Sequence, residues 1–547
     1  MINTSYTLSA VQNPNIKYQP ANKKRAREVY TNFTSASEPK YTKSVYNDAQ
    51  TVHTSWFYIN DLHGKMTKME RIYKMSQDFD NLSSTKTWSF FSNTTDDKIS
   101  KFKVASGDIS IGSNKNNNTV ASKFLDWCGF VASALGNHEM DVVEPNDLAA
   151  LIKDSRCKML ALNVEADKNS ALAGRFEKSM IIEKNGEKFG ILGIAPSDMF
   201  DRVKMTPSLS SIKVASHEQT IKLLQQEVDK LKAQGINKII LLSHSGLNND
   251  KKLVQETDGI DIIFSAHTHE LVKGIEEGKN LLYSRAGEPV ILTEAGKNGD
   301  YVGILNVDFN KDGIITKAQN NIIPTAPYTR PLYVKDAVEQ IIGKPEIVGV
   351  VSKTVPMPKH NLIEDNPHGN LIVDAMRHEL GADIGILNTG NIRGIFSEGP
   401  VDSRLVADIS PFEDKMMLLS LSEKEIVDAI KVGCKSLVQN SRPGILMLSG
   451  MQYTCNKKGE LLSLDYIDKN DKVHPIDINN PRTDKKYTVA VDDFFATGGD
   501  NYLPTNPNPD FILETYDFDK NKLACDYIKK LKQPFEIKYD GRLQIVD

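Results

Sequence analysis

Short apolar runs that end in polar residues or glycine recur along the first half of the chain. Residues 56–59 precede Asn60 and Asp61, and residues 102–105 precede Ser106-Gly107-Asp108. Continuous apolar runs of this length are typical of buried strands, which present polar residues where they end. The pattern therefore predicts a buried sheet with chemistry at its strand ends. Further runs of this form occupy residues 158–164, 189–194, 238–242 and 260–264.

Segments with helical spacing separate these runs. The clearest one stops at Gly235, a favourable C-terminal cap, and places apolar residues on one face. Strands that alternate with such helices predict mixed α/β layers. The apolar face of the clearest helix consists of Ile221, Leu224, Val228 and Leu231.

The 547 residues exceed what one hydrophobic core usually organises, so two large domains are expected. Residues 1–50 are rich in Asn, Ser, Thr, Tyr and Lys, which predicts a partly irregular N-terminal extension. Residues 51–328 form the first predicted domain, and residues 329–345 form a linker helix or hinge. Residues 346–547 form a second, smaller α/β domain.

The composition argues against several kinds of partner and site. The net charge of −4 gives no general attraction to a nucleic acid polymer or an anionic membrane. Five cysteines without a C-x-x-C pair argue against a thiolate metal site or a disulfide framework. No apolar run is long enough to span a membrane, and Met1–Pro20 lacks the apolar stretch of a signal peptide. By sequence alone, the protein is expected in the cytoplasm.

Five polar blocks follow, or nearly follow, predicted strands. Each block alone is common, because Asp-x-His occurs by chance and a single histidine is more often structural. Their combination at successive strand ends indicates one site. The blocks are Asp61-Leu62-His63-Gly64, Gly107-Asp108, Gly136-Asn137-His138-Glu139, His244 and His267-Thr268-His269.

The residue types in these blocks suit a centre of two divalent metal ions. Carboxylates, neutral imidazoles and an amide oxygen form a mixed set that fits Mn, Fe, Co or Zn, and Asp108 suits the bridging position. Two cations would hold a phosphate and lower the pKa of an attacking water. The expected ligands are Asp61, His63 and His269 for the first cation, and Asn137, His244 and His267 for the second.

His138 is the candidate catalytic residue. It stands next to a predicted ligand, where an imidazolium could donate a proton to the leaving oxygen. Asp141, three residues on, could hold that imidazole in the required tautomer. Glu139 is expected to support the ligands or the fold rather than react.

The blocks resemble the signature of the calcineurin-like metallophosphoesterases, and residues 107–113 and 138–141 are similar to its 5'-nucleotidase branch. In the second half, residues 369–376 resemble the helix that opens the family's C-terminal domain. The resemblance covers about residues 50–547. It implies a four-layer metallophosphoesterase β-sandwich flanked by helices, a linker helix and a smaller α/β substrate-binding domain. Further matching segments are residues 388–393, 411–412, 449–453 and 494–500.

The resemblance also implies contacts with a nucleotide. Phe412 and Phe494 would sandwich the nucleobase by its faces. Asp500 would bind ribose hydroxyls, while Asn388 and Arg393 would contact phosphate. A rotation at the linker would bring the base and phosphate sites together.

The chain departs from the family pattern in three respects. The family commonly has an arginine shortly before the domain-opening helix, whereas residues 360–365 here read His-Asn-Leu-Ile-Glu-Asp. A phosphate contact would then be supplied differently. Ala266 replaces the glycine usual before His-x-His. The resemblance implies export to the periplasm or cell surface, as for most relatives, whereas no signal peptide is recognised in Met1–Pro20.

The resemblance implies two-metal hydrolysis of a nucleotide phosphate ester, in the first place by a 5'-nucleotidase acting on nucleoside 5'-monophosphates. The same ligands would serve a 2',3'-cyclic-nucleotide 2'-phosphodiesterase/3'-nucleotidase or a nucleotide-sugar pyrophosphatase. A nuclease would need a basic groove. A catalytically inactive binding protein would be expected to have lost metal ligands, whereas every expected metal ligand is present in this sequence. The sequence leaves the metal, the preferred nucleotide and the oligomeric state open.

Overall fold

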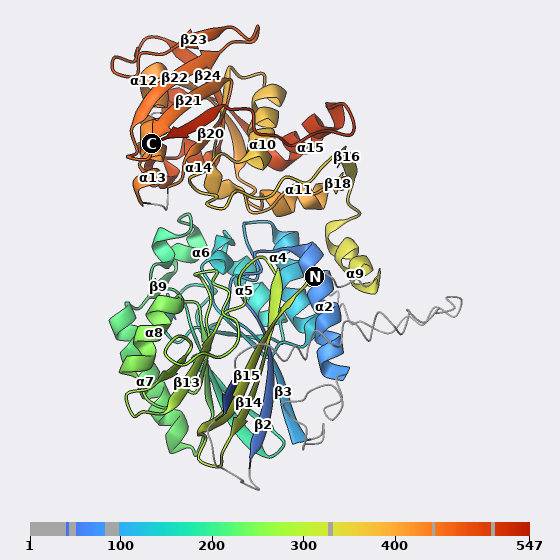
Figure 1. Ribbon diagram of the computed structural model, residues 1–547, viewed down its shortest axis with the longest axis vertical. Helices are drawn as coiled ribbons and strands as arrows, with labels where there is room; N and C mark the ends of the chain where they lie inside the picture. Colours follow the sequence, from blue (N-terminus) through green and yellow to red (C-terminus); the bar gives the residue numbers. More distant parts are fainter. Residues whose placement is uncertain (1–39, 43–50, 82–97, 327–331, 440–442, 505–508) are drawn as a thin grey trace, which may run out of the picture.

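The computed structural model describes residues 40–42, 51–81, 98–326, 332–439, 443–504 and 509–547. It consists of two lobes, one above the other in Figure 1. Most of the predicted N-terminal extension lies outside the described residues. Within the extension, β1 (Lys40–Thr42) is a strand that pairs antiparallel with β15 (Ile315–Pro324), an element the sequence did not predict.

The lower lobe in Figure 1 has two central sheets with helices outside both, which makes four layers. This is the predicted sandwich. The first sheet has the order β1-β15-β14-β2-β3-β4-β5, with β2 (Val52–Ile59), β3 (Ile99–Ala105), β4 (Ala132–Ala134), β5 (Lys158–Leu160) and β14 (Tyr301–Phe309). The second has the order β12-β13-β11-β10-β8-β7, with β7 (Ser179–Lys184), β8 (Glu187–Ile194), β10 (Ile239–Ser243), β11 (Ile262–Phe264), β12 (Leu281–Tyr283) and β13 (Pro289–Thr293). The outer helices include α2 (Met66–Asn81), α4 (Lys115–Cys128), α5 (Pro145–Asp154), α7 (His217–Ala233) and α8 (Leu247–Glu256).

Aromatic side chains fill the space between the two sheets. Trp56 of β2 stacks on Phe102 of β3 at a ring separation of 4.3 Å. It also meets the edge of Phe189 from β8 in the opposite sheet, at 6.1 Å. All three are buried. Large buried aromatic rings contribute most to such a core, so these contacts fix the two sheets face to face.

The predicted strands agree with the structure with one exception. Residues 158–164 were expected to form one strand, but they contain β5, a turn and the start of β6 (Val164–Ala166). The turn arises because the Asn163 side chain bonds both backbone groups of Ala195 instead of continuing the ladder. The helix predicted before Gly235 is α7, whose four apolar positions are buried.

The upper lobe contains its own core. A five-stranded sheet has the order β20-β17-β24-β19-β25, and a four-stranded sheet has the order β23-β22-β21-β26. The helix α9 (Leu332–Ile342) connects the two lobes along the chain. Its buried Val338 packs in the core of the lower lobe, where α9 contacts α2 and α4. Elements of this lobe used below are β16 (Ile347–Val351), α10 (Pro367–Glu379), β17 (Ile384–Asn388), α11 (Ser403–Ile409), α12 (Glu423–Cys434), β24 (Lys486–Asp492) and α14 (Asp493–Ala496).

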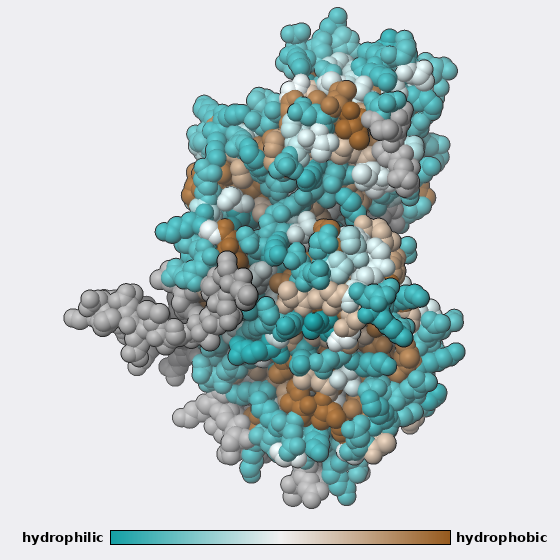
Figure 2. Space-filling model, turned by 180° about the vertical axis from the view of Figure 1, so that it is seen from behind, coloured by the Kyte–Doolittle hydropathy of each residue, from teal (hydrophilic) through white to brown (hydrophobic). Residues whose placement is uncertain are grey.

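Most of the surface seen in Figure 2 is hydrophilic, with separate hydrophobic patches on both lobes. Scattered apolar residues of this kind are normal on a protein surface. Among the helices within the described ranges, none combines the length and apolar character needed to cross a bilayer.

His368, in the first turn of α10, is a buried histidine that the fold keeps neutral. Its Nε2–H donates to the Val355 carbonyl at 3.0 Å, and its Nδ1 accepts from the Phe396 amide at 3.1 Å. Burial lowers the pKa of His368 to about 4, although the bond to Val355 acts in the opposite direction. Protonation of Nδ1 would remove the Phe396 bond.

This arrangement predicts an acid-sensitive contribution to stability. Because the folded pKa lies below the unfolded value, the contribution is fully present above about pH 6.5 and is lost as the pH falls towards 4. From pH 7 to pH 5 the free energy of unfolding should fall by about 2 kcal/mol more than in His368→Gln, whose side chain does not titrate. Denaturant unfolding at both pH values measures this, and an equal loss in the two proteins would contradict it.

Candidate active site

The candidate ligands gather at one edge of the sandwich because the strands that precede them are parallel. β2 pairs parallel with β3, and β3 with β4, while β10 pairs parallel with β11. The carboxyl ends of neighbouring parallel strands lie side by side, so residues after them converge. These residues are Asp61 and His63 after β2, Asp108 after β3, Asn137 and His138 after β4, His244 after β10, and His267 and His269 after β11.

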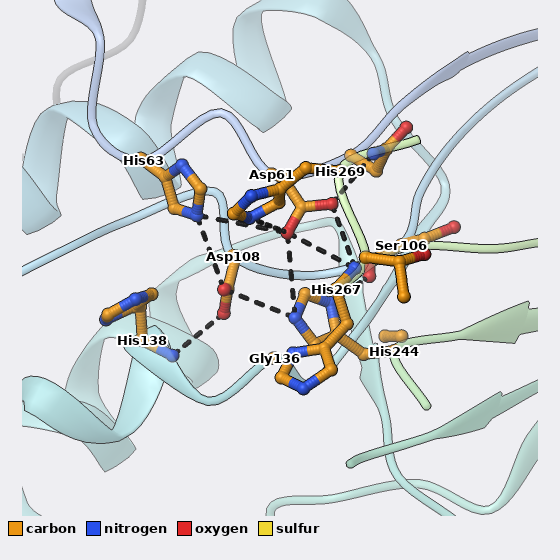
Figure 3. A network of polar contacts seen from close by, with 12 residues as sticks. Asp61, His63, Ser106, Asp108, Gly136, His138, His244, His267 and His269 are labelled. Atoms are coloured by element: carbon orange, nitrogen blue, oxygen red, sulfur yellow. Dashed lines mark hydrogen bonds and ion pairs between the residues drawn. The ribbon is translucent and has the colours of Figure 1, made fainter. Parts of the chain in front are cut away.

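Two carboxylates lie at the centre of the cluster (Figure 3). An Asp108 oxygen lies 3.2 Å from His244 Nε2 and 3.5 Å from His63 Nε2. An Asp61 oxygen lies 3.4 Å from His269 Nε2 and 3.8 Å from the same two ring nitrogens of His63 and His244. Both aspartates therefore approach imidazoles from more than one strand end, as a shared pair of metal sites requires.

The tautomers of two of these histidines suit metal binding. His63 Nδ1 bonds the Asn298 side-chain oxygen at 3.0 Å, and His244 Nδ1 bonds the Ser106 carbonyl at 2.6 Å. Both acceptors require a proton on Nδ1, so Nε2 is the nitrogen that faces the carboxylates. Outer partners of this kind orient metal-bound imidazoles in many proteins.

Three of the candidate ligand atoms are buried and make no hydrogen bond among the described residues. They are His63 Nε2, His244 Nε2 and the Asn137 side-chain oxygen. A buried polar atom without a partner costs about 1–3 kcal/mol, so its presence in three neighbouring residues needs a reason. Divalent cations bound by nitrogen and oxygen would satisfy all three, and the residues present fit such ions.

Backbone strain coincides with the same positions. Five candidate ligands adopt left-handed φ angles that non-glycine residues rarely use. Each costs on the order of 1–3 kcal/mol and persists where surrounding structure enforces it, which occurs mostly at functional sites. The residues and their φ values are Asp61 (48°), His63 (50°), Asp108 (52°), His267 (77°) and His269 (62°).

The electrostatics keep the carboxylates ionised. Burial alone would raise the pKa of Asp108, but His244 and His138 outweigh it and hold that pKa well below the usual range. For His63, burial lowers the pKa to about 4. For His244, the two aspartates overcome burial and raise the pKa to about 10.

The Glu139 carboxylate connects two of the loops that carry candidate metal ligands. One carboxylate oxygen accepts from the amides of Asp108 and Gly136 at 2.9 and 2.8 Å. The other accepts from the amides of Ile109 and Ser110 at 2.8 and 3.2 Å. The sequence indicated a supporting role for Glu139, and these four hydrogen bonds show that it links the loops after β3 and β4.

Glu139→Ala should therefore destabilise the lower lobe. It leaves four amides without an acceptor, and each unsatisfied buried group costs about 1–3 kcal/mol. We expect the free energy of unfolding to fall by at least about 3 kcal/mol in denaturant titrations. The exposed Glu165 of β6 offers a control, since Glu165→Ala should stay within about 0.5 kcal/mol of the wild type. A loss no larger than that of the control would refute the role of Glu139.

His138 lies beside the Asp108 carboxylate in a fixed orientation. Its Nδ1 bonds Asp141 at 2.8 Å, and its backbone amide donates to Asp108 at 2.8 Å. Asp141 also accepts from the Gly112 amide, which fixes the carboxylate itself. Burial acts to lower the pKa of His138, but Asp141 and Asp108 outweigh it and raise that pKa. The ring can thus carry a proton on Nε2.

The His267 ring lies next to the His244 ring, with ring centres 5.1 Å apart. Its amide donates to the Asp61 carboxylate at 3.0 Å, and its Nε2 lies 3.3 Å from Asp198. Asp198 is a partner that the sequence did not reveal, because it follows β8 and belongs to none of the five blocks.

The upper lobe brings two of its candidate residues to this cluster. The Arg393 guanidinium covers the Phe412 ring at 5.4 Å, and that ring lies 6.1 Å from the ring of His138. Further contacts join the two lobes. They join Lys65 to the Asp408 carbonyl, Asn114 to Glu413, Lys204 to Asp493 at 3.3 Å, and Glu70 to Arg404 at 3.8 Å.

The other three candidate substrate residues, Asn388, Phe494 and Asp500, also belong to the upper lobe. The Asn388 oxygen, at the end of β17, accepts from the Asn391 side chain at 2.5 Å. Phe494 follows Asp493, which contacts the lower lobe through Lys204, and its ring lies against Gly499. Asp500 comes just after the glycine pair, with a left-handed φ of 51°. Their roles stay predictions.

Comparison with known proteins agrees with this architecture. Residues 57–271 match the family model of the calcineurin-like phosphoesterases, and residues 347–505 match the model of the 5'-nucleotidase C-terminal domain. The 5'-nucleotidase of Mus musculus is 27% identical over 461 residues, which cover 77% of each chain.

Two further relatives extend the comparison. The trifunctional nucleotide phosphoesterase protein YfkN of Bacillus subtilis is 25% identical over 496 residues, covering 81% of this chain but only 32% of YfkN. The crystal structure of a 5'-nucleotidase precursor from Thermus thermophilus shares the fold with a TM-score of 0.70 at 21% identity, over 90% of this chain and 99% of that one. With one domain model matched in each lobe, the chain belongs to the 5'-nucleotidase family of metal-dependent phosphoester hydrolases.

Proposed function

We propose that the protein hydrolyses nucleoside 5'-monophosphates to nucleoside and phosphate at a centre of two divalent cations. The observation that carries this proposal is the pair of shared carboxylates, Asp61 and Asp108, faced by buried imidazole nitrogens that make no hydrogen bond. Such a donor set has no structural purpose without cations.

The first cation would be held by Asp61, His63 and His269, and the second by Asn137, His244 and His267, with Asp108 between them. When bound, such cations supply Lewis-acid activation of the phosphate ester and of the attacking water. The carboxylates, kept ionised by their neighbours, are ready for this role.

His138 provides the proton for the leaving group. Water adds to phosphorus, the bond from phosphorus to the ribose 5'-oxygen breaks, and that oxygen takes the proton from His138 Nε2. One proton of the attacking water stays on the phosphate product and the other is released to solvent, from which His138 is protonated again. Asp141 holds the opposite nitrogen, so Nε2 is the end that faces the substrate.

The upper lobe would bind the rest of the nucleotide. Arg393 and Asn388 would contact phosphate, Phe412 and Phe494 the base, and Asp500 the ribose. Because the Phe412 ring lies 6.1 Å from the His138 ring and Arg393 covers Phe412, a site between the lobes is supported. The segment at residues 329–345 would be the hinge between domains 51–328 and 346–547.

Phosphate release by the purified protein with manganese tests the proposal. The panel is AMP, UMP, 3'-AMP, 2',3'-cyclic AMP, ATP and UDP-glucose. Fastest turnover of AMP and UMP is the expected result. Preference for the cyclic or 3' substrates, or for UDP-glucose, would assign the site to a different nucleotide ester and overturn the proposed substrate. Elemental analysis of the active protein would identify the metal among Mn, Zn, Fe and Co.

A further inference from the structure

Lys520, the first residue of α15 (Lys520–Lys530) in the upper lobe, is a lysine with no exposure to solvent. Its Nζ donates to the Phe412 carbonyl at 2.7 Å and lies 3.6 Å from the Asp492 carboxylate. A second carboxylate, that of the partly exposed Asp414, lies 3.7 Å from the same Nζ. Lysines are almost never fully buried unless they are paired, so this ammonium needs a specific reason.

Asp492 connects this ammonium to a second segment of the chain. It is the last residue of β24 and is 1% exposed. One carboxylate oxygen faces Lys520, while the other accepts from the Phe495 amide at 3.0 Å and caps the N-terminus of α14. Phe494 belongs to this capped turn, so Asp492 fixes the backbone on which Phe494 stands. Burial raises the pKa of Asp492, and Lys520 is the strongest opposing influence.

The segment that carries Phe412 is held at two points by the start of α15. Besides the bond from Lys520, the Asn521 side chain donates to the Ser410 carbonyl at 2.8 Å. The Phe412 ring itself is partly exposed and lies 6.1 Å from the ring of His138. Its backbone is therefore fixed while its ring stays available at the candidate active site.

Phe412 and Phe494 thus depend on the two members of one buried ion pair, although they come from distant parts of the sequence. Both side chains are partly exposed. A buried ion pair is a poor source of stability, because the loss of hydration of both charges offsets their attraction. The pair of Lys520 and Asp492 does provide direction, since one ammonium contacts a carbonyl of the first segment and the carboxylate that caps the second.

We propose that Lys520 and Asp492 are positioning residues that hold Phe412 and Phe494 at the separation needed to bind a nucleobase between them. This inference rests on the proposed function, in which these two rings contact the base. Neither Lys520 nor Asp492 would touch the substrate. Because stacking depends on where the rings lie, loss of the ion pair should weaken binding of the base. The phosphate and the cations at the lower lobe should be bound as before.

Calorimetric binding of adenosine to the manganese-loaded protein tests the proposal without turnover. Lys520→Met keeps the length of the side chain but removes its charge, and it should weaken adenosine binding about tenfold and raise KM for AMP by a similar factor. Turnover of ribose 5-phosphate, the same ester without a base, should stay at the wild-type level. Lys522→Met, at an exposed lysine of the same helix, should change none of these quantities.

A double variant separates positioning from stability. Lys520→Met leaves the buried Asp492 without its partner, so its unfolding midpoint in denaturant should fall. Lys520→Met/Asp492→Asn removes both charges and keeps a side-chain oxygen to cap α14, so it should regain most of the lost stability. Adenosine affinity should stay low in the double variant, because the link between the two segments is still absent. Recovery of affinity together with stability would show a purely structural role and overturn the proposal.

Unchanged adenosine affinity in Lys520→Met would also overturn the proposal, as would an equal loss in Lys522→Met. A wild type that binds no adenosine would do the same, because no base would then lie between the rings. Failure of the proposed function looks different: the wild type would bind adenosine but release no phosphate from AMP. The calorimetric comparison still decides the role of Lys520 in that case.

Discussion

His138→Ala is expected to lower kcat for AMP by about 100- to 10,000-fold, the range typical for loss of a general acid. The leaving ribose oxygen then departs without the proton that Nε2 supplies. The cations should stay bound, because His138 is not among the expected ligands. Steady-state phosphate release together with elemental analysis of the variant measures both effects.

His378→Ala provides the matched control. His378 lies near the end of α10 in the upper lobe and is exposed, so its removal should leave kcat unchanged. A variant at position 138 that keeps more than a third of wild-type kcat would contradict the assigned role. A variant that loses activity together with its metal would place His138 among the ligands instead.

Asp108→Asn should have the other large effect. The carboxylate lies within 3.5 Å of ring nitrogens from two different strand ends, and its other oxygen accepts the His138 amide. An amide keeps the shape but removes the negative charge that would bridge two cations. We expect bound metal to fall below one equivalent and turnover to fall by more than the ~100-fold typical for an outer partner of a metal ligand.

Asp312→Asn, at an exposed turn before β15, keeps the same chemical change away from the site. It should leave metal content and turnover at wild-type levels. If Asp108→Asn retains two equivalents of metal and full activity, the carboxylate does not bridge the cations, and the assignment of the centre is wrong.

Local sequence patterns predicted mixed α/β layers with the candidate ligands at strand ends, and the family resemblance implied the sandwich. The apolar runs before Asp61 and Asp108 fix β2 and β3, and parallel pairing then brings the residues after them together. The same logic places His244 with His267 and His269. The single strand expected over residues 158–164 was wrong because Asn163 bonds Ala195, which is 32 residues away.

Other parts of the site could not be predicted because they depend on contacts without a local signature. Asp198 and Asn298 approach ligand histidines from loops 69 and 235 residues distant. The contact of Phe412 with His138 likewise depends on how the two lobes pack.

Phosphate release from AMP by chelator-treated protein, titrated with manganese, tests the central claim that the shared carboxylates and histidines form the catalytic metal centre. The account predicts no turnover after chelation and a saturable return of activity as about two equivalents of metal bind per chain. Turnover that persists unchanged after complete removal of metal would contradict it.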